Sequence, residues 1–196
     1  MIPKSLTALG VLAALLVAGC GTSDSPATGA STTGNPTDRA FVAQMIPHHQ
    51  SAVQMATIAK RRATGAFVMQ LAEDIVRTQT AEIATMRGAD QRLKAAGVKP
   101  GSLGVSEHMM GMDGDVASLN TAKPFDAAFM RMMVPHHQGA VVMANAELKS
   151  GKDPALKKLA RNIIRAQQRE IGQMRKQLAS TGGAGTMGMH GAGHSG

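Results

Sequence analysis

Apolar residues recur every three or four positions along four stretches of the chain, which is the spacing of an amphipathic helix. The stretches span residues 38–62, 67–96, 126–149 and 154–179. The first stretch is joined to the second, and the third to the fourth, by the short glycine-containing segments RRATGA and KSGKDP. Each pair is therefore expected to fold back as an antiparallel hairpin, and two hairpins predict an all-α four-helix bundle.

The two hairpins are copies of one unit. Residues 38–87 align with residues 126–175 without a gap, and 21 of these 50 positions are identical. Such agreement indicates an internal duplication and a pseudo-twofold molecule. The connection between the copies, residues 97–124, is long for a helical bundle and contains the run EHMMGMDGD, which is typical of a crossover or a functional loop. The bundle as a whole is expected to span residues 38–180.

Each first helix carries a pair of histidines directly after a proline. The residues are Pro47, His48 and His49 in the first copy and Pro135, His136 and His137 in the second. On a helical wheel, the first histidine of each pair faces the apolar side and the second lies beside it. Proline lacks the N–H that a helix interior needs, so each proline is expected to kink its helix or to begin a new segment.

A glutamate lies within the apolar face of each second helix. Glu82 falls among residues such as Ile75 and Met86, and Glu170 takes the same place in the second copy. A carboxylate there needs a cation, a proton or a metal ion to offset the loss of its hydration. The second copy also places Glu147 on the inward face of its first helix, where the first copy has alanine.

The repetition of histidine pairs, glutamates and methionines in register predicts a metal site inside the bundle. Thioether sulfur is a soft ligand and imidazole is borderline, which favours copper, Cu(I) ahead of Cu(II). The candidate ligands are His48, His49, His136, His137, Met45, Met55, Met86, Met133, Met143, Met174, Glu82 and Glu170. Gln79 and Gln167 are expected to orient the ligands or to be satisfied buried amides. For each methionine, packing in the core is the alternative to ligation.

Two further segments combine methionine with histidine. The connection holds His108, Met109, Met110 and Met112, and the tail of residues 181–196 holds Met187, Met189, His190 and His194. By composition both segments are flexible, and they are expected to act as auxiliary metal-binding sites that capture or exchange the ion. The alternative is a connector and a tail with no metal-binding role.

The N-terminal segment is typical of an exported protein. Residues 1–19 combine Lys4 with a short apolar run, a pattern that predicts a signal peptide rather than a membrane-spanning helix. Cys20 follows Val-Ala-Gly, and this resembles the bacterial lipoprotein signal, in which the cysteine carries the lipid. Residues 20–37 are small and polar, which is typical of a disordered tether. These features predict a lipid anchor in the cell membrane and a protein on its extracytoplasmic face.

The composition of the chain excludes several kinds of site and partner. Cys20 is the only cysteine, so the chain cannot form an internal disulfide, a thiolate zinc cluster or an iron–sulfur site. The chain contains no Trp and no Tyr to stack on bases. Without Lys4 the side-chain charge is 20 minus 13, or +7, which suits an anionic membrane surface, while export argues against a nucleic-acid partner.

The repeated motifs resemble the bacterial family known as domain of unknown function 305. Its hallmark M-[IV]-P-H-H-Q occurs here as MIPHHQ and MVPHHQ, each followed by an A-x-x-M-A run, and Q-x-x-E-I-x-x-M follows on the next helix. The resemblance covers residues 38–178. It implies a ferritin-like helical bundle that is secreted or lipid-anchored, and for some relatives a link to copper binding and copper tolerance through Met and His.

The sequence therefore predicts an extracytoplasmic copper-binding lipoprotein that sequesters copper, confers tolerance to it or transfers it to a partner protein, without catalysis. Two other classes stay open. One is a ferritin-like di-iron or di-manganese carboxylate oxidase, although no Glu-x-x-His sequence occurs in the chain. The other is a structural or interaction bundle whose histidines are pH-sensitive hydrogen-bonding groups.

Overall fold

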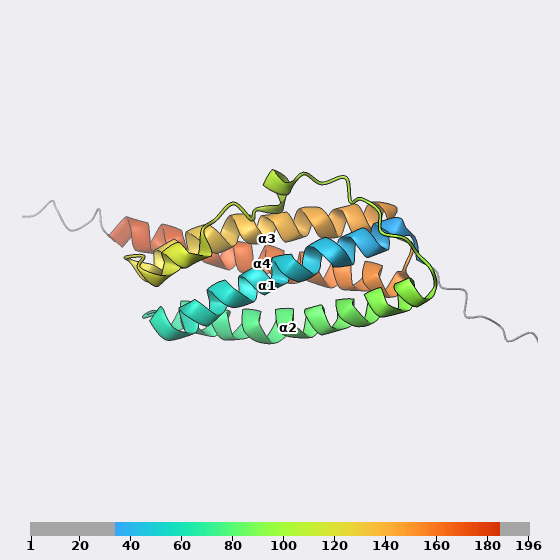
Figure 1. Cartoon of the computed structure of the whole chain (residues 1–196). Helices are drawn as coiled ribbons and strands as arrows, with labels where there is room; N and C mark the ends of the chain where they lie inside the picture. Colours follow the sequence, from blue (N-terminus) through green and yellow to red (C-terminus); the bar gives the residue numbers. More distant parts are fainter. Residues whose placement is uncertain (1–33, 185–196) are drawn as a thin grey trace, which may run out of the picture. The chain divides into compact units, whose positions relative to one another are not determined.

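The computed structural model describes residues 34–184, in which four α-helices form a bundle (Figure 1). The helices are α1 (Pro36–Arg62), α2 (Ala66–Ala95), α3 (Phe125–Ser150) and α4 (Pro154–Ala184). Two short 3-10 turns, η1 (Glu107–Met110) and η2 (Val116–Asn120), lie in the connection between α2 and α3. No strand occurs among residues 34–184, so the predicted all-α class is confirmed. Helix α4 continues past residue 180, where the sequence placed the end of the bundle.

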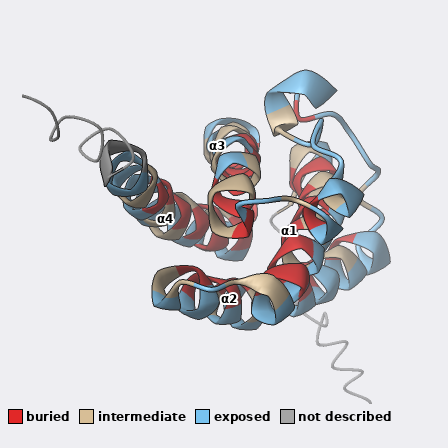
Figure 2. Ribbon diagram, turned by 90° about the vertical axis from the view of Figure 1, so that its left-hand side faces the viewer, coloured by how far each residue is buried: buried red, intermediate tan, exposed pale blue. Residues whose placement is uncertain are grey.

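The helices pair as two antiparallel hairpins, α1 with α2 and α3 with α4. The hairpins meet mainly through α1 and α3, whereas α2 and α4 contact each other little. In the view along the bundle, the buried residues of the four helices face one another (Figure 2). This is the predicted ferritin-like bundle of two duplicated hairpins. Within the described range, no helix combines the length and the apolar character that crossing a membrane requires.

A reciprocal aspartate contact ties the two hairpins together. Asp38, near the start of α1, accepts hydrogen bonds at Oδ1 from the backbone N–H groups of residues 152 and 153, both at 2.9 Å. Its counterpart Asp126, near the start of α3, accepts from the N–H groups of residues 64 and 65, at 3.1 and 2.7 Å. These N–H groups precede α4 and α2, where a helix leaves donors without intrahelical partners. Each repeat therefore caps a turn of the other repeat.

Helices α1 and α3 run without a break through Pro47 and Pro135. Of the two effects expected of these prolines, a new helical segment is therefore wrong, and a kink stays a prediction. A proline in a helix interior costs about 3 kcal/mol, because it removes one N–H donor and its ring crowds the preceding turn. In α1 the residues on both sides of the proline, such as Met45 and His48, are buried in the same bundle. This packing on both sides outweighs the local cost and keeps the chain in one helix.

The buried apolar side chains form two clusters. The first includes Phe41, Met45, Met86, Met143 and Ile163, and the second includes Phe129, Met133, Met174, Met55 and Ile75. Every residue named for the first cluster has its counterpart from the other repeat in the second cluster. The duplication of the sequence has therefore produced two equivalent apolar cores.

A layer of polar side chains lies between the two apolar clusters. Each helix contributes two residues to this central layer. The residues are His48 and His49 of α1, Gln79 and Glu82 of α2, His136 and His137 of α3, and Gln167 and Glu170 of α4. Along every helix, the central layer separates residues of one cluster from residues of the other. Because buried polar groups cost free energy unless they find partners, the central layer is the candidate functional site.

Candidate metal centre

Two of the four histidines in the central layer are held by glutamates from the neighbouring helix. His49 Nε2 lies 2.8 Å from Glu82 Oε2, and His137 Nε2 lies 2.6 Å from Glu170 Oε2. Both rings are fully buried, whereas the two glutamate side chains are 19% and 17% exposed and lie at the rim of the layer. Because these carboxylates are partly exposed to solvent, they lose less hydration than their positions on the apolar faces of α2 and α4 predict. A carboxylate on one ring nitrogen fixes the ring and leaves the other nitrogen free to bind a metal ion.

The other two histidines meet in the middle of the layer. The ring centroids of His48 and His136 are 3.8 Å apart, and the ring planes are tilted by 34°. His48 Nε2 lies 2.9 Å from the backbone carbonyl oxygen of Met110 in the connection. Because a carbonyl can only accept, His48 carries its proton on Nε2. The centroid distances to His49 and His137 within each pair are 6.2 and 6.4 Å, so the four imidazoles share one layer.

Burial keeps the two middle rings uncharged. Loss of hydration is the main cause that lowers the pKa of His48 to about 3, and the neighbouring His49 is the second. Burial also holds the pKa of His136 far below its ordinary value, with His48 as the second cause. A neutral imidazole offers the nitrogen lone pair that a metal ion needs. His48 and His136 are therefore neutral, and able to bind a metal ion, at neutral pH.

Several buried polar atoms of the layer lack a hydrogen-bond partner among the described residues. They are His48 Nδ1, His49 Nδ1, His136 Nδ1 and Nε2, His137 Nδ1, Gln79 Oε1 and Gln167 Oε1. Each unpaired buried polar atom costs about 1–3 kcal/mol, so a group of them in one layer is expensive unless a ligand satisfies it. The unpaired atoms are mostly imidazole nitrogens, which suit a transition-metal ion.

The six candidate methionines of the bundle flank the layer. Three belong to each apolar cluster, and all are buried. Met45 and Met133 each precede a middle histidine by three residues, which places the thioether about one helical turn away. Among the described residues, no group of three or more His, Cys, Asp or Glu side chains is arranged to hold a metal ion. A metal ion in the layer would therefore need methionine sulfur or a small shift of a histidine ring.

Of the candidate residues in the connection, only Met110 reaches the layer, and it does so through its backbone. Met109 and Met112 are 54% and 42% exposed. His108 is exposed as well, and its Nδ1 lies 3.0 Å from Asp113 Oδ2. The other candidates lie outside the described residues. These are Met187, Met189, His190, His194 and the lipidation candidate Cys20.

Glu147 is fully buried near the end of α3, where burial, followed by the neighbouring Asp38 carboxyl, raises the pKa of the Glu147 carboxyl to about 8. Sequence reasoning placed Glu147 on the inward face but assigned it no role. It also missed the Met110 carbonyl, since side-chain patterns do not report backbone contacts. The one signal for that contact is Gly139 of α3, where the first repeat has Ser51.

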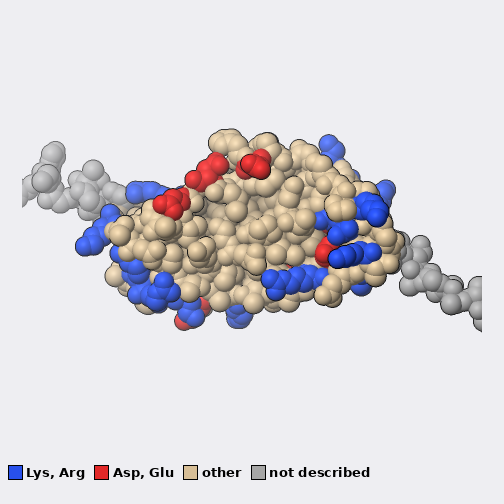
Figure 3. Space-filling model, in the orientation of Figure 1, with Lys and Arg blue, Asp and Glu red and all other residues tan. Residues whose placement is uncertain are grey.

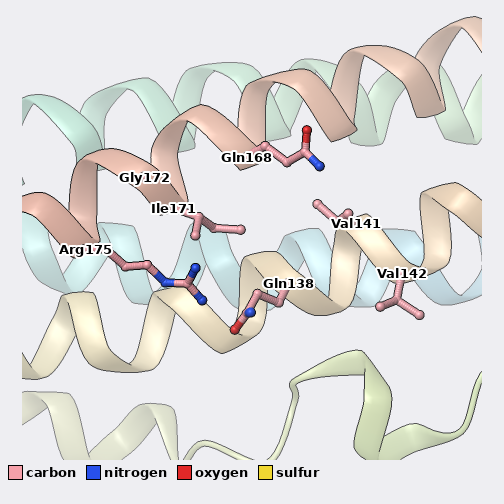
Figure 4. A pocket seen from close by; sticks show the side chains of 7 residues that line it. All are labelled: Gln138, Val141, Val142, Gln168, Ile171, Gly172 and Arg175. Atoms are coloured by element: carbon pink, nitrogen blue, oxygen red, sulfur yellow. The ribbon is translucent and has the colours of Figure 1, made fainter.

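A hollow of about 420 Å³ between α3 and α4 provides a contrast to the central layer. Its wall consists of Gln138, Val141, Val142, Gln168, Ile171, Gly172 and Arg175. Figure 4 shows the apolar side chains of Val141 and Ile171 between the two helices, with polar side chains around them. None of the seven residues is a His or a Met. This hollow therefore offers none of the ligands that the repeated motifs provide.

The fold and the central layer define a class of protein: a four-helix bundle of two duplicated hairpins, each with a Pro-His-His sequence inside its first helix. Residues 38–178 match the family model described as Domain of unknown function (DUF305), and the chain belongs to this family. The family resemblance of the repeated motifs is thus confirmed. An uncharacterized protein of Acanthamoeba polyphaga mimivirus, L153, is 40% identical over 53 residues; the match covers 27% of this chain and 35% of that protein.

Solved structures of similar proteins share this fold. CopM in its Cu(I)-bound form is 34% identical over 73% of this chain and 96% of that chain, with a TM-score of 0.61. CopM has also been solved in Cu(II)-bound, Ag-bound and apo forms. A predicted secreted DUF305 protein from Streptomyces coelicolor is 30% identical over 74% of this chain and 94% of that chain, with a TM-score of 0.64. A DUF305 fragment from Deinococcus radiodurans is 34% identical over 75% of this chain and 98% of that chain, with a TM-score of 0.63.

Proposed function

We propose that this protein binds copper ions in the central layer and holds them for sequestration, tolerance or transfer, without catalysing a reaction. One observation carries the proposal: the four histidines of one layer present buried ring nitrogens that lack partners among the described residues. Thioethers of buried methionines flank that layer. Support comes from CopM, a relative of similar fold that has been solved with Cu(I), Cu(II) and Ag.

Each kind of side chain has its own part in this proposal. His48 and His136 are the inner ligands, because both are neutral, buried and close to each other. His49 and His137 bind through Nδ1, since a glutamate takes up each Nε2 and balances part of the ion's charge. The methionines one turn away supply thioether sulfur, which favours Cu(I) over Cu(II).

The arrangement of carboxylates favours a copper carrier over a di-iron or di-manganese oxidase. An oxidase of that kind uses a carboxylate from each of four helices and two Glu-x-x-His motifs. In the central layer only α2 and α4 supply a glutamate, and each glutamate already contacts a histidine. The layer therefore carries too little negative charge for two divalent ions and suits one monovalent ion better.

The proposed place of action is the extracytoplasmic face of the cell membrane. Residues 1–19 would act as the signal peptide, and Cys20 would carry the lipid that anchors the chain. A relative from Streptomyces coelicolor that is predicted to be secreted supports export. A copper-transfer protein on the same side of the membrane is the proposed partner.

The experiment that tests the proposal is an anaerobic Cu(I) titration of residues 21–196 against a competing chelator, with Zn(II) as the comparison ion. The double variant His48→Gln with His136→Gln keeps polar side chains of similar size, and we expect it to lower Cu(I) affinity at least about 100-fold. The exposed His108→Gln is the matched control and should bind as the wild type does. Circular dichroism should show that all three proteins keep the helical fold.

Two results would contradict the proposal. The central layer would be the wrong site if the double variant bound Cu(I) with unchanged affinity and stoichiometry. The same holds if a chain that ends at Ala184 lost all Cu(I) binding, because the tail would then hold the ion. Since the chain contains no Trp and no Tyr, protein concentration in these titrations must come from amino-acid analysis.

A further inference from the structure

The backbone of the connection lies directly against α3, beside the central layer. A Cβ atom at Gly139 would overlap the carbonyl group of Met110, and a Cβ atom at Gly111 would overlap the carbonyl oxygen of Pro135. Gly111 also has a φ of 66°, a conformation that glycine adopts without strain. The two glycines therefore permit a contact between backbones that a larger residue would force open.

This contact closes one side of the middle histidine pair. It brings the Met110 carbonyl to 2.9 Å from His48 Nε2, so this nitrogen is taken up by the connection. At the equivalent position of the second repeat, both ring nitrogens of His136 lack a partner among the described residues. The connection thus contacts only one of two histidines that the duplication made equivalent.

A hollow of about 370 Å³ lies next to this closure. Its wall includes the carboxylates of Glu107 and Asp113, the thioether of Met112 and the ring of His48, which is only 1% exposed. Gln44 also lines the hollow, and its buried Oε1 has no hydrogen-bond partner among the described residues. Sulfur and oxygen donors at the surface thus lead to a buried imidazole.

The charge around this hollow differs from that of the rest of the chain. Residues 107–115 contain three carboxylates and no Lys or Arg, although the whole chain has a net charge of +8. Figure 3 shows Asp and Glu side chains gathered on the side where the connection lies, while Lys and Arg occupy other parts of this face. A local negative potential raises the rate at which a cation meets this surface.

We propose that Glu107, Met110, Met112 and Asp113 of the connection form the entrance of the metal centre. The carboxylates of Glu107 and Asp113 attract a monovalent soft cation, Cu(I), and the Met112 thioether binds it in the hollow. The ion reaches the central layer when the Met110 carbonyl releases His48 and frees the ring to turn toward the ion. This inference rests on the proposed copper-binding function, to which it adds a transient surface site and a route inward.

Loading kinetics test the entrance separately from the final site. Met112→Leu removes the sulfur but keeps an apolar side chain of similar size. Met69→Leu is the matched control, because Met69 is 42% exposed, as Met112 is, but lies on α2 and does not line the hollow. Residues 21–196 receive Cu(I) from a coloured chelator complex in an anaerobic stopped-flow experiment, and Ag(I) serves as a redox-inert second probe. We expect Met112→Leu to slow loading at least about fivefold and to leave equilibrium affinity and stoichiometry unchanged.

The outcomes separate this inference from the proposed function. Equal loading rates for Met112→Leu and the wild type would overturn the entrance and leave the central layer in place as the metal site. A loss of equilibrium binding in Met112→Leu would also overturn it, because Met112 would then be a permanent ligand. If the wild type bound neither Cu(I) nor Ag(I), the proposed function would fail, and the entrance would fail with it.

Discussion

The two repeats keep the same central residues but differ in what surrounds them. Each supplies two histidines, a glutamine and a glutamate to the central layer. Around the layer the repeats diverge: the connection contacts His48 of the first repeat, and it packs on Gly139 of the second repeat, where the first has Ser51. For the proposed metal centre, the comparison separates two requirements, a symmetric inner site and a one-sided entrance.

The ends of the bundle differ as well. At the end near Asp38 the second repeat supplies Glu147 and Asp153, whereas the corresponding residues of the first repeat are Ala59 and Gly65. Glu147 therefore faces the carboxylates of Asp38 and Asp153, and the positive charge of Lys157 only partly offsets their effect on its pKa. The other end, built around Asp126, lacks this crowding of acids. The end near Asp38 thus carries a buried carboxyl with a raised pKa.

The largest effect on stability is expected from truncating a buried phenylalanine in each of the two equivalent apolar cores. Phe41→Ala and Phe129→Ala each remove a fully buried ring, and each should lower the free energy of unfolding by about 3–5 kcal/mol. Urea unfolding followed by circular dichroism measures both losses. If the duplication made the cores energetically equivalent, the two losses agree within about 1 kcal/mol. A loss confined to one variant would show that one half of the bundle carries most of the stability.

Glu147→Gln tests the difference between the two ends. The pKa of Glu147 is raised from 4.5 to about 8, so the folded protein keeps a proton that the unfolded chain has lost. The stability that this proton contributes is fully present below pH 4.5 and is lost as the pH rises to about 8. Glutamine has a similar size and does not titrate. The variant should therefore exceed the wild type by a few kcal/mol at pH 9 and match it closely at pH 4.5.

The control for this comparison is Glu73→Gln, on the exposed side of α2. It should follow the wild-type profile of stability against pH. His48 and His136 act in the opposite direction, because their pKa values are lowered: the stability they contribute is present above about pH 6.5 and is lost on acidification. Profiles for Glu147→Gln and the wild type that ran parallel from pH 4.5 to 9 would show that the carboxyl of Glu147 is ionised in the folded protein.

Much of the fold could be predicted, because helical periodicity and the duplication point to the same answer. The repeated stripe of apolar residues placed all four helices within a few residues of their observed bounds. A new helical segment at Pro47 and Pro135, one of the two expected effects, was wrong, since a local rule about proline carries no information about the packing that surrounds it. The contact between Asp38 and the turn that precedes α4 was not predicted for the same reason, because residues 38 and 152 meet only after the hairpins assemble.

The candidate site was predictable as far as side chains on regular helices determine it. Helical spacing predicted that the histidine pairs face inward and that Glu82 and Glu170 lie on the facing helices. In the structure each of these glutamates contacts a histidine. The Met110 carbonyl could not be found in this way, because it comes from an irregular segment and is a backbone group. Its position depends on a glycine of α3 that shows no periodic signal.

Gly139→Ala breaks the asymmetry between the repeats directly. The new Cβ would overlap the Met110 carbonyl, so the connection must move away, and we expect a stability loss of about 1–3 kcal/mol. Gly88→Ala is the control, because nothing lies within 4 Å of its Cβ position and alanine favours the helix. Nitrogen NMR of the metal-free protein should show that Gly139→Ala loses the single Nε2–H form of His48. An unchanged His48 signal would mean that the carbonyl contact does not depend on this glycine.

The smallest effect on stability is expected from Asp113→Asn, at the acidic surface of the connection. Asp113 pairs with His108, and both side chains are largely exposed, so their pair contributes less than about 1 kcal/mol. If the carboxylate acts by attracting the ion, the variant should load Cu(I) about twofold more slowly at low salt and as fast as the wild type at high salt, where ions screen exposed charges. Chloride binds Cu(I), so a fluoride or nitrate salt must set the ionic strength. A slowdown of equal size at all salt concentrations would instead make Asp113 a direct ligand, and the one-sided access would then depend on coordination rather than on charge.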